Sequence, residues 1–125
     1  MMNKKRPKHL ALHKIILPLP GFVSILHRVS GFFLFLFLPL LLWMLQASMR
    51  SIETYTHMVE ILQHPFIKLV LLGLVWSFWH HFCAGIRYMA IDLHIIANLA
   101  RARSSSWWVL GVSLLLTALT GASLW

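Results

Sequence analysis

Two adjacent histidines, His80 and His81, lie near the end of a long apolar segment that starts at about Phe66. The interval between Lys68 and Arg87 holds no charged residue, and as a helix it spans roughly 27 Å, enough to cross the hydrocarbon core of a bilayer. A polar side chain at membrane depth is costly and is therefore a candidate functional group. Neutral imidazole is a common axial ligand of haem iron, so one hypothesis is a haem site. The other is that both rings only hydrogen-bond a neighbouring helix.

The spacing around the two histidines distinguishes them. Residues four apart lie on the same side of a helix. Stepping by four through His81 gives only small residues: Gly73, Ser77 and Gly85. Small residues let a partner helix or a flat ring approach the backbone closely. The same step through His80 gives a bulkier ridge with Trp76 on it, so we predict His81 as the ligand.

Composition indicates a membrane protein. Of the 125 residues, 59% are hydrophobic and 11% are charged, whereas a soluble domain has about 25% charged residues. The formal charge is +8, but the basic residues flank apolar spans, a pattern typical of membranes and not of nucleic-acid binding. Cys83 is the only cysteine, so a C-x-x-C-H thioether site is excluded and any haem is held non-covalently. We interpret Cys83 as a small packing residue.

The pattern predicts an all-α protein with three transmembrane helices. We expect a basic segment over residues 1–21 and one membrane domain over residues 22–125, with helices at about 22–49, 65–92 and 107–125. Residues 17–20, Leu-Pro-Leu-Pro, are expected to be extended, and Pro39 is expected to kink the first helix. Residues 50–63 and 93–106 are expected to form loops, the first partly helical. The tryptophans at both ends of the third helix are expected to be interfacial anchors.

Charge asymmetry predicts the orientation of the chain. Five Lys or Arg residues precede Pro18, and the second loop contains Arg101 and Arg103. The first loop balances Arg50 with two glutamates. The positive-inside rule therefore places the N-terminus in the cytoplasm and the C-terminus on the far side. His81 would then lie about 9 Å above Arg87, in the cytoplasmic half of the bilayer.

A second group of polar residues opens the first helix. Ser24 and Arg28 share one face, and His27 and Gly31 share another. Arg28 could bind a carboxylate such as a haem propionate, or polarise a quinone carbonyl, and Ser24 could donate a hydrogen bond to the same quinone. The alternative is that Arg28 reaches lipid headgroups and Ser24 caps the helix. Together with His81 at similar depth, these residues favour a haem and quinone site.

The two motifs resemble a known family. Residues 24–31, S-I-L-H-R-V-S-G, and residues 81–92, H-x-x-x-G-I-R-x-x-x-x-D, resemble the cytochrome b subunit, or large membrane anchor, of succinate dehydrogenase. Arg6 and Pro7 also match its basic start. The resemblance covers about residues 6–92 by motif, and the third span agrees in position and length. Tyr88 stands where many relatives have histidine, and His80 where they often have tyrosine.

The resemblance implies a non-catalytic anchor subunit in a bacterial inner membrane, with its C-terminus in the periplasm. The anchor holds an iron–sulfur subunit and a flavoprotein subunit at the cytoplasmic face. Haem b lies between it and a second small anchor, each supplying one axial histidine, here His81. Ser24 and Arg28 match the family's quinone site, for ubiquinone or another quinone. His27 and Arg28 match positions close to the haem propionates.

Other functions remain as alternatives. The chain could be the cytochrome b anchor of fumarate reductase or of another quinone-linked complex, or a haem-free structural anchor whose histidines join helices. A small transporter is disfavoured, because the sequence has no visible internal repeat. We expect no nucleic-acid partner. We also expect no succinate site in this chain, because 125 mostly apolar residues contain no dinucleotide-binding pattern.

Overall fold

The structure, a computed structural model, describes residues 16–125 and is helical throughout its regular elements. The four helices are α1 (Leu19–Ser48), α2 (Ile52–Gln63), α3 (Pro65–Asp92) and α4 (Leu99–Leu124). Of these, α1, α3 and α4 are long and apolar enough to cross a membrane. The predicted all-α, three-span architecture is therefore confirmed. Residues 1–15, with Arg6 and Pro7 among them, lie outside the described residues.

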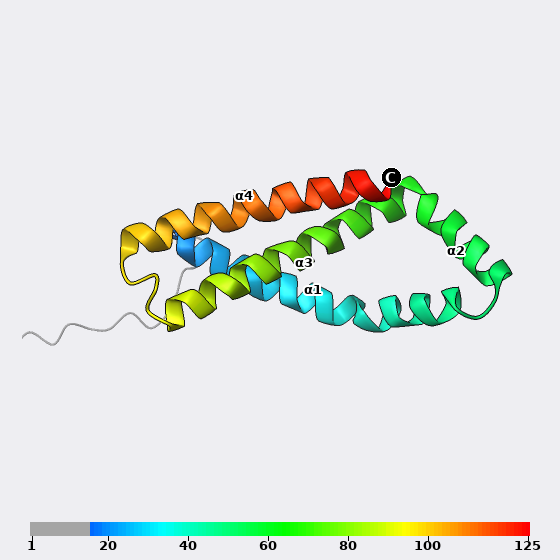
Figure 1. The fold of residues 1–125 in the computed structure, drawn as a ribbon, viewed down its shortest axis with the longest axis horizontal. Helices are drawn as coiled ribbons and strands as arrows, with labels where there is room; N and C mark the ends of the chain where they lie inside the picture. Colours follow the sequence, from blue (N-terminus) through cyan, green and yellow to red (C-terminus); the bar gives the residue numbers. More distant parts are fainter. Residues whose placement is uncertain (1–15) are drawn as a thin grey trace, which may run out of the picture.

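Helix α3 is the centre of the arrangement. Figure 1 shows α4 lying along α3 and α1 crossing α3, while α2 bridges the ends of α1 and α3 far from that crossing. Near the C-terminus, the Lys68 ammonium lies 5.7 Å from the centre of the Trp125 ring, so α3 and α4 run antiparallel. The end of α3 and the starts of α1 and α4 therefore lie at one end of the molecule.

Two predicted helix starts are wrong, those of α1 and α4, and the loop predicted to be partly helical is a helix over residues 52–63. Helix α1 begins at Leu19, because Pro18 is the extended cap residue and Pro20 falls in the first turn, where its missing N–H costs nothing. Residues 52–63 form a complete helix that starts with a capping box between Ser51 and Thr54. Helix α4 begins at Leu99 instead of residue 107. Pro39 lies inside a continuous α1.

The early start of α4 has a local cause. The Asn98 side chain accepts a hydrogen bond from the backbone N–H of Arg101 at 2.8 Å and so caps the helix. The Ser106 hydroxyl donates to the Ala102 carbonyl at 2.8 Å. Serine hydroxyls in this stretch thus donate hydrogen bonds to carbonyls of the preceding helical turn. A polar sequence that suggested a loop can therefore be helical.

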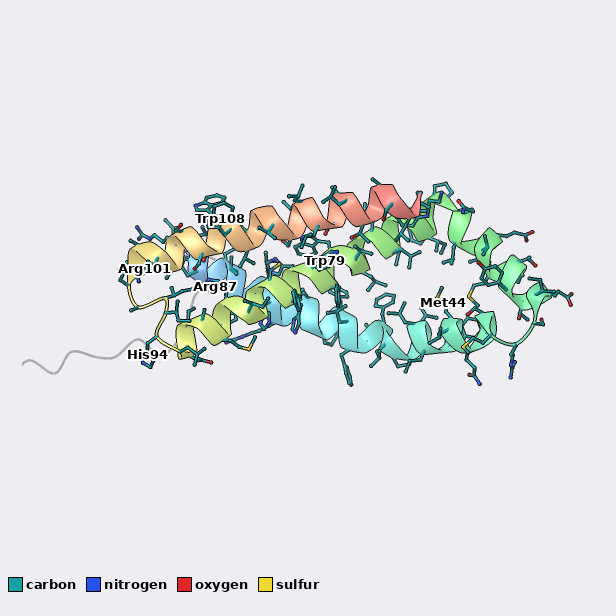
Figure 2. The ribbon with its side chains drawn as sticks, in the orientation of Figure 1. Met44, Trp79, Arg87, His94, Arg101 and Trp108 are labelled. Atoms are coloured by element: carbon teal, nitrogen blue, oxygen red, sulfur yellow. The ribbon has the colours of Figure 1, made fainter. Side chains whose placement is uncertain are left out.

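Close packing joins α4 to α3. Ser106, Ser113 and Thr117 are buried, and each hydroxyl donates to a carbonyl of its own helix. Their small side chains let the two backbones approach, as in other membrane helix pairs. The Trp79 indole, which Figure 2 shows between the two helices, donates from Nε1 to the Thr120 hydroxyl at 3.0 Å.

Arg87 ties the end of α3 to the start of α4. Its side chain is buried, with Nε donating to Ser105 Oγ at 3.0 Å and Nη2 donating to the Ala102 carbonyl at 3.2 Å. The guanidinium also lies 5.4 Å from the centre of the Tyr88 ring. The sequence suggested only a charge at the membrane boundary, whereas the structure gives Arg87 a role in packing.

Helix α1 is apolar but has few neighbours within the chain. Only Val23 and Ser30 of this helix are buried, and its exposed side chains include Phe22, Val29, Phe32, Phe33 and Phe35. Most of its surface is therefore available to lipid or to another membrane protein.

We predict that Arg87→Leu destabilises the helical bundle by about 1.5–3 kcal/mol, because it removes hydrogen bonds from a charged donor. The measurement is the thermal unfolding midpoint of the membrane-extracted protein, followed by circular dichroism. The control is Arg103→Leu, since Arg103 is exposed and its loss is expected to change stability by less than about 0.5 kcal/mol. Equal effects of the two substitutions would contradict the assigned role of Arg87.

Candidate functional site

The predicted ligand His81 lies where α3 crosses α1. Its Nδ1 atom is 3.0 Å from the His27 carbonyl oxygen and 3.4 Å from Ser30 Oγ. The Ser30 hydroxyl donates to the same carbonyl at 2.9 Å. The two motifs found in the sequence are therefore joined by direct contact, and the expectation that they share one end of the bundle is confirmed.

The contact with the His27 carbonyl assigns the tautomer of His81. A carbonyl oxygen only accepts hydrogen bonds, so Nδ1 of His81 must carry the hydrogen. The other nitrogen, Nε2, then has a free lone pair, and it makes no hydrogen bond to any residue between 16 and 125. An imidazole whose Nδ1–H is fixed by a carbonyl is the form that binds a metal through Nε2.

A second imidazole covers one face of the His81 ring. The His27 ring is stacked on it, with centroids 4.2 Å apart and planes 11° apart. The centre of the Tyr88 ring lies 5.2 Å from that of the His27 ring. The Tyr88 hydroxyl is buried and has no hydrogen-bond partner among the described residues. The His81 ring is thus held by the His27 carbonyl at Nδ1 and by the His27 ring on one face.

His80 has a different environment. Its side chain is 0% exposed, and its ring is stacked on Trp76 with centroids 5.2 Å apart. Neither ring nitrogen has a hydrogen-bond partner within residues 16–125, although the Val23 backbone lies nearby. Because both nitrogens are covered by this chain, His80 cannot reach a group outside it. The geometry favours His81, whose role as a ligand remains a prediction.

The strip of small residues has two different surroundings. Gly73 and Ser77 line a groove of about 290 Å³ between α1 and α3, whose α1 wall includes Val29 and Phe33. A Cβ atom added at Gly73 would meet nothing within 4 Å. Gly85, one turn beyond His81, instead lies against His27 of this chain. Gly73 therefore remains open to another molecule, whereas Ser77 is buried and its hydroxyl donates to the Gly73 carbonyl at 2.9 Å.

Ser24 and Arg28 lie on α1 one turn or less from His27. Ser24 is half-buried and Arg28 is exposed. The structure gives neither side chain a hydrogen bond to another described residue, and it does not bring them into contact with His81. Both remain available to a group outside this chain.

The parts of α1 that hold His81 were not predicted from the sequence. These are the His27 carbonyl, the Ser30 hydroxyl and the bare backbone at Gly31. The available signal was a glycine inside an apolar helix, four residues after His27, which usually marks a close approach of another group.

Comparisons with known proteins identify the family of this chain. The family model described as "Succinate dehydrogenase/Fumarate reductase transmembrane subunit" matches residues 2–120. A succinate dehydrogenase cytochrome b556 subunit of Coxiella burnetii is 37% identical over 99% of this chain and 100% of its own length. The protein of the same name from Paracoccus denitrificans is 27% identical, covering 94% of this chain and 89% of its own. For the one from Rickettsia felis the identity is 30%, covering 92% and 90%. The chain therefore belongs to the succinate dehydrogenase/fumarate reductase transmembrane subunit family.

Proposed function

We propose that this chain is the cytochrome b anchor of a succinate dehydrogenase and that His81 supplies one axial ligand to haem b. The observation that supports this most directly is the hydrogen bond from His81 Nδ1 to the His27 carbonyl, which leaves the Nε2 lone pair free. Three membrane-length helices and the names of the relatives agree with an anchor.

The residues around His81 fit a haem. The Gly73–Ser77 groove next to it is apolar and open, as the face of a macrocycle requires. His27 and Arg28 are proposed to hold the propionates, and the exposure of Arg28, a permanent cation, supports this. When bound, haem supplies one-electron transfer. A second anchor subunit is proposed to supply the other axial histidine, because the family resemblance implies one ligand from each of two anchors.

Ser24 and Arg28 are proposed to form part of a quinone-reduction site. A quinone gains two electrons and two protons, so its carbonyl oxygens carry developing negative charge. The Arg28 guanidinium stabilises that charge as a fixed cation, and the Ser24 hydroxyl orients the ring by donating a hydrogen bond. Both residues belong to the first turns of α1, at the end of the molecule where α3 ends.

The orientation of the chain follows from its loops. We propose that this end faces the cytoplasm of a bacterium, where the iron–sulfur and flavoprotein subunits bind, and that the C-terminus faces the periplasm. The family also includes fumarate reductase subunits, but the relatives named above are succinate dehydrogenase cytochrome b556 subunits. A haem-free anchor is the remaining alternative, and a visible spectrum of the complex distinguishes it.

We predict that His81→Ala removes low-spin haem from the assembled complex, because Nε2 of His81 is an axial ligand. The matched control is His80→Ala, which removes the neighbouring imidazole. Because both ring nitrogens of His80 are covered by this chain, this substitution is expected to leave the haem spectrum low-spin. The measurement is the reduced-minus-oxidised spectrum per complex. Loss of low-spin haem in His80→Ala with a normal spectrum in His81→Ala would reverse the assignment.

Ser24→Ala and Arg28→Leu are each expected to slow quinone-linked turnover by about 100-fold. This is the lower end of what one preorganised hydrogen-bond donor contributes, and it is expected because water reaches a site at the membrane interface. Electron transfer from succinate to an artificial acceptor that bypasses the membrane is expected to stay near the parent rate. Arg50→Leu serves as the control, because Arg50 is exposed beyond the other end of α1.

Haem content and subunit ratio are measured for each of these variants, since Arg28 also lies near the proposed propionates. Variants that assemble, retain haem and reduce quinone at the parent rate would place the quinone site elsewhere.

Expression of this chain alone is expected to give little haem-loaded protein, because half of the ligand set and the partner of the open groove are missing. The measurement is the haem-to-protein ratio after extraction, compared with the co-expressed complex. A stable, haem-saturated monomer would argue against the two-anchor arrangement.

A further inference from the structure

Gly31 lies directly beneath the ring of His81. A Cβ atom built at Gly31 would be 2.8 Å from Cε1 and 3.1 Å from Nδ1 of that ring. Real Cβ atoms essentially never come that close to another heavy atom, so any other residue at position 31 forces a shift. The space that a side chain would need is occupied by the imidazole itself.

The His81 ring has little freedom to give way. Its Nδ1 atom is held by the His27 carbonyl at 3.0 Å, and its face is covered by the His27 ring. Turning or lifting the ring away from position 31 would lengthen that hydrogen bond and disturb the stack. The alternative is to separate α1 from α3, which are joined at their crossing by these same contacts.

The glycine is also unfavourable for the helix that contains it. Gly31 is in the interior of α1, where alanine would stabilise helix more. No turn or positive φ requires glycine there, because none of the glycines of the described chain has a positive φ. The close approach of His81 is the one feature of this position that a side chain would abolish.

We propose that Gly31 is a positioning residue for the axial ligand, setting the depth and orientation of the His81 imidazole against the α1 backbone. The proposal rests on the function proposed for His81. Without a side chain at position 31, the ring lies close enough to α1 for Nδ1–H to reach the His27 carbonyl. That contact in turn fixes the direction of the Nε2 lone pair.

The test is Gly31→Ala in the complete complex, measured by haem content, the low-spin spectrum and the midpoint potential of the haem. Disturbing groups that orient a metal ligand typically weakens metal affinity by about 10- to 100-fold, and we expect a loss of haem retention of that order with a shifted potential. The matched control is Gly111→Ala in α4, where an added Cβ meets nothing within 4 Å. It makes the same change in helix propensity and is expected to leave the haem signals unchanged.

A double-mutant cycle separates positioning from packing. In a His81→Ala background the ring is gone, so an alanine at position 31 meets open space and its helix propensity acts alone. We therefore expect Gly31→Ala to lower the thermal midpoint of the complex when His81 is present, and to leave it unchanged or raise it when His81 is absent. Where a variant does not assemble, the amount of chain retained in the membrane is compared in the two backgrounds.

Each outcome has a defined meaning. Equal losses in both backgrounds would overturn the proposal and assign Gly31 to contact with another helix. A Gly31→Ala complex with the parent's haem content and midpoint potential would also overturn the proposal for Gly31. If His81→Ala loses haem in the same experiments, the assignment of His81 as a ligand still holds. If His81→Ala itself keeps a normal low-spin spectrum, the proposed function fails and Gly31 cannot act through it.

Discussion

The hydrogen bond from His81 to the His27 carbonyl is the contact on which the rest of the site depends. It joins side chain to backbone across the α1–α3 crossing. The carbonyl also accepts a hydrogen bond from the Ser30 hydroxyl, and the imidazole keeps Nε2 free because Nδ1 is committed to the carbonyl. This one contact fixes the tautomer of His81 and joins α1 to α3 at the end of the bundle where Ser24 and Arg28 lie.

Polar side chains extend from helix α3 in different directions, some toward α1 and others toward α4. Successive residues of a helix point about 100° apart, given 3.6 residues per turn. His81 therefore faces α1 while His80, one residue earlier, stacks on Trp76 in the interior. Arg87 and Trp79 hydrogen-bond α4. Helix α4 thus braces α3, and the α1 side is left for ligand chemistry. A buried neutral imidazole without a hydrogen bond is costly, and stacking on an indole offsets part of that cost for His80.

Much of this could be predicted from the sequence, because membrane spans depend on local composition. The charge-free runs located α1 and α3. The choice of His81 over His80 as a ligand, made from the spacing of Gly73, Ser77 and Gly85, stays a prediction. The start of α4 was missed because serine hydroxyls that bond their own helix look polar in a sequence. The contact of Gly31 with His81 depends on where two helices cross, which spacing within either helix does not determine. The buried role of Arg87 was missed for the same reason, since its partners lie on α4.

The open surfaces of this chain bear on the proposed second anchor subunit. Apolar side chains on α1 gain nothing by leaving lipid for another apolar surface, so association in the membrane depends on close packing and shared polar contacts. The groove lined by Gly73 and Ser77, proposed above to receive the haem, begins one helical turn from His81. In the proposed function, the Nε2 lone pair of His81 supplies one of two haem ligands, and a second anchor supplies the other. A partner chain bound over this groove would then enclose the haem and complete its ligand pair.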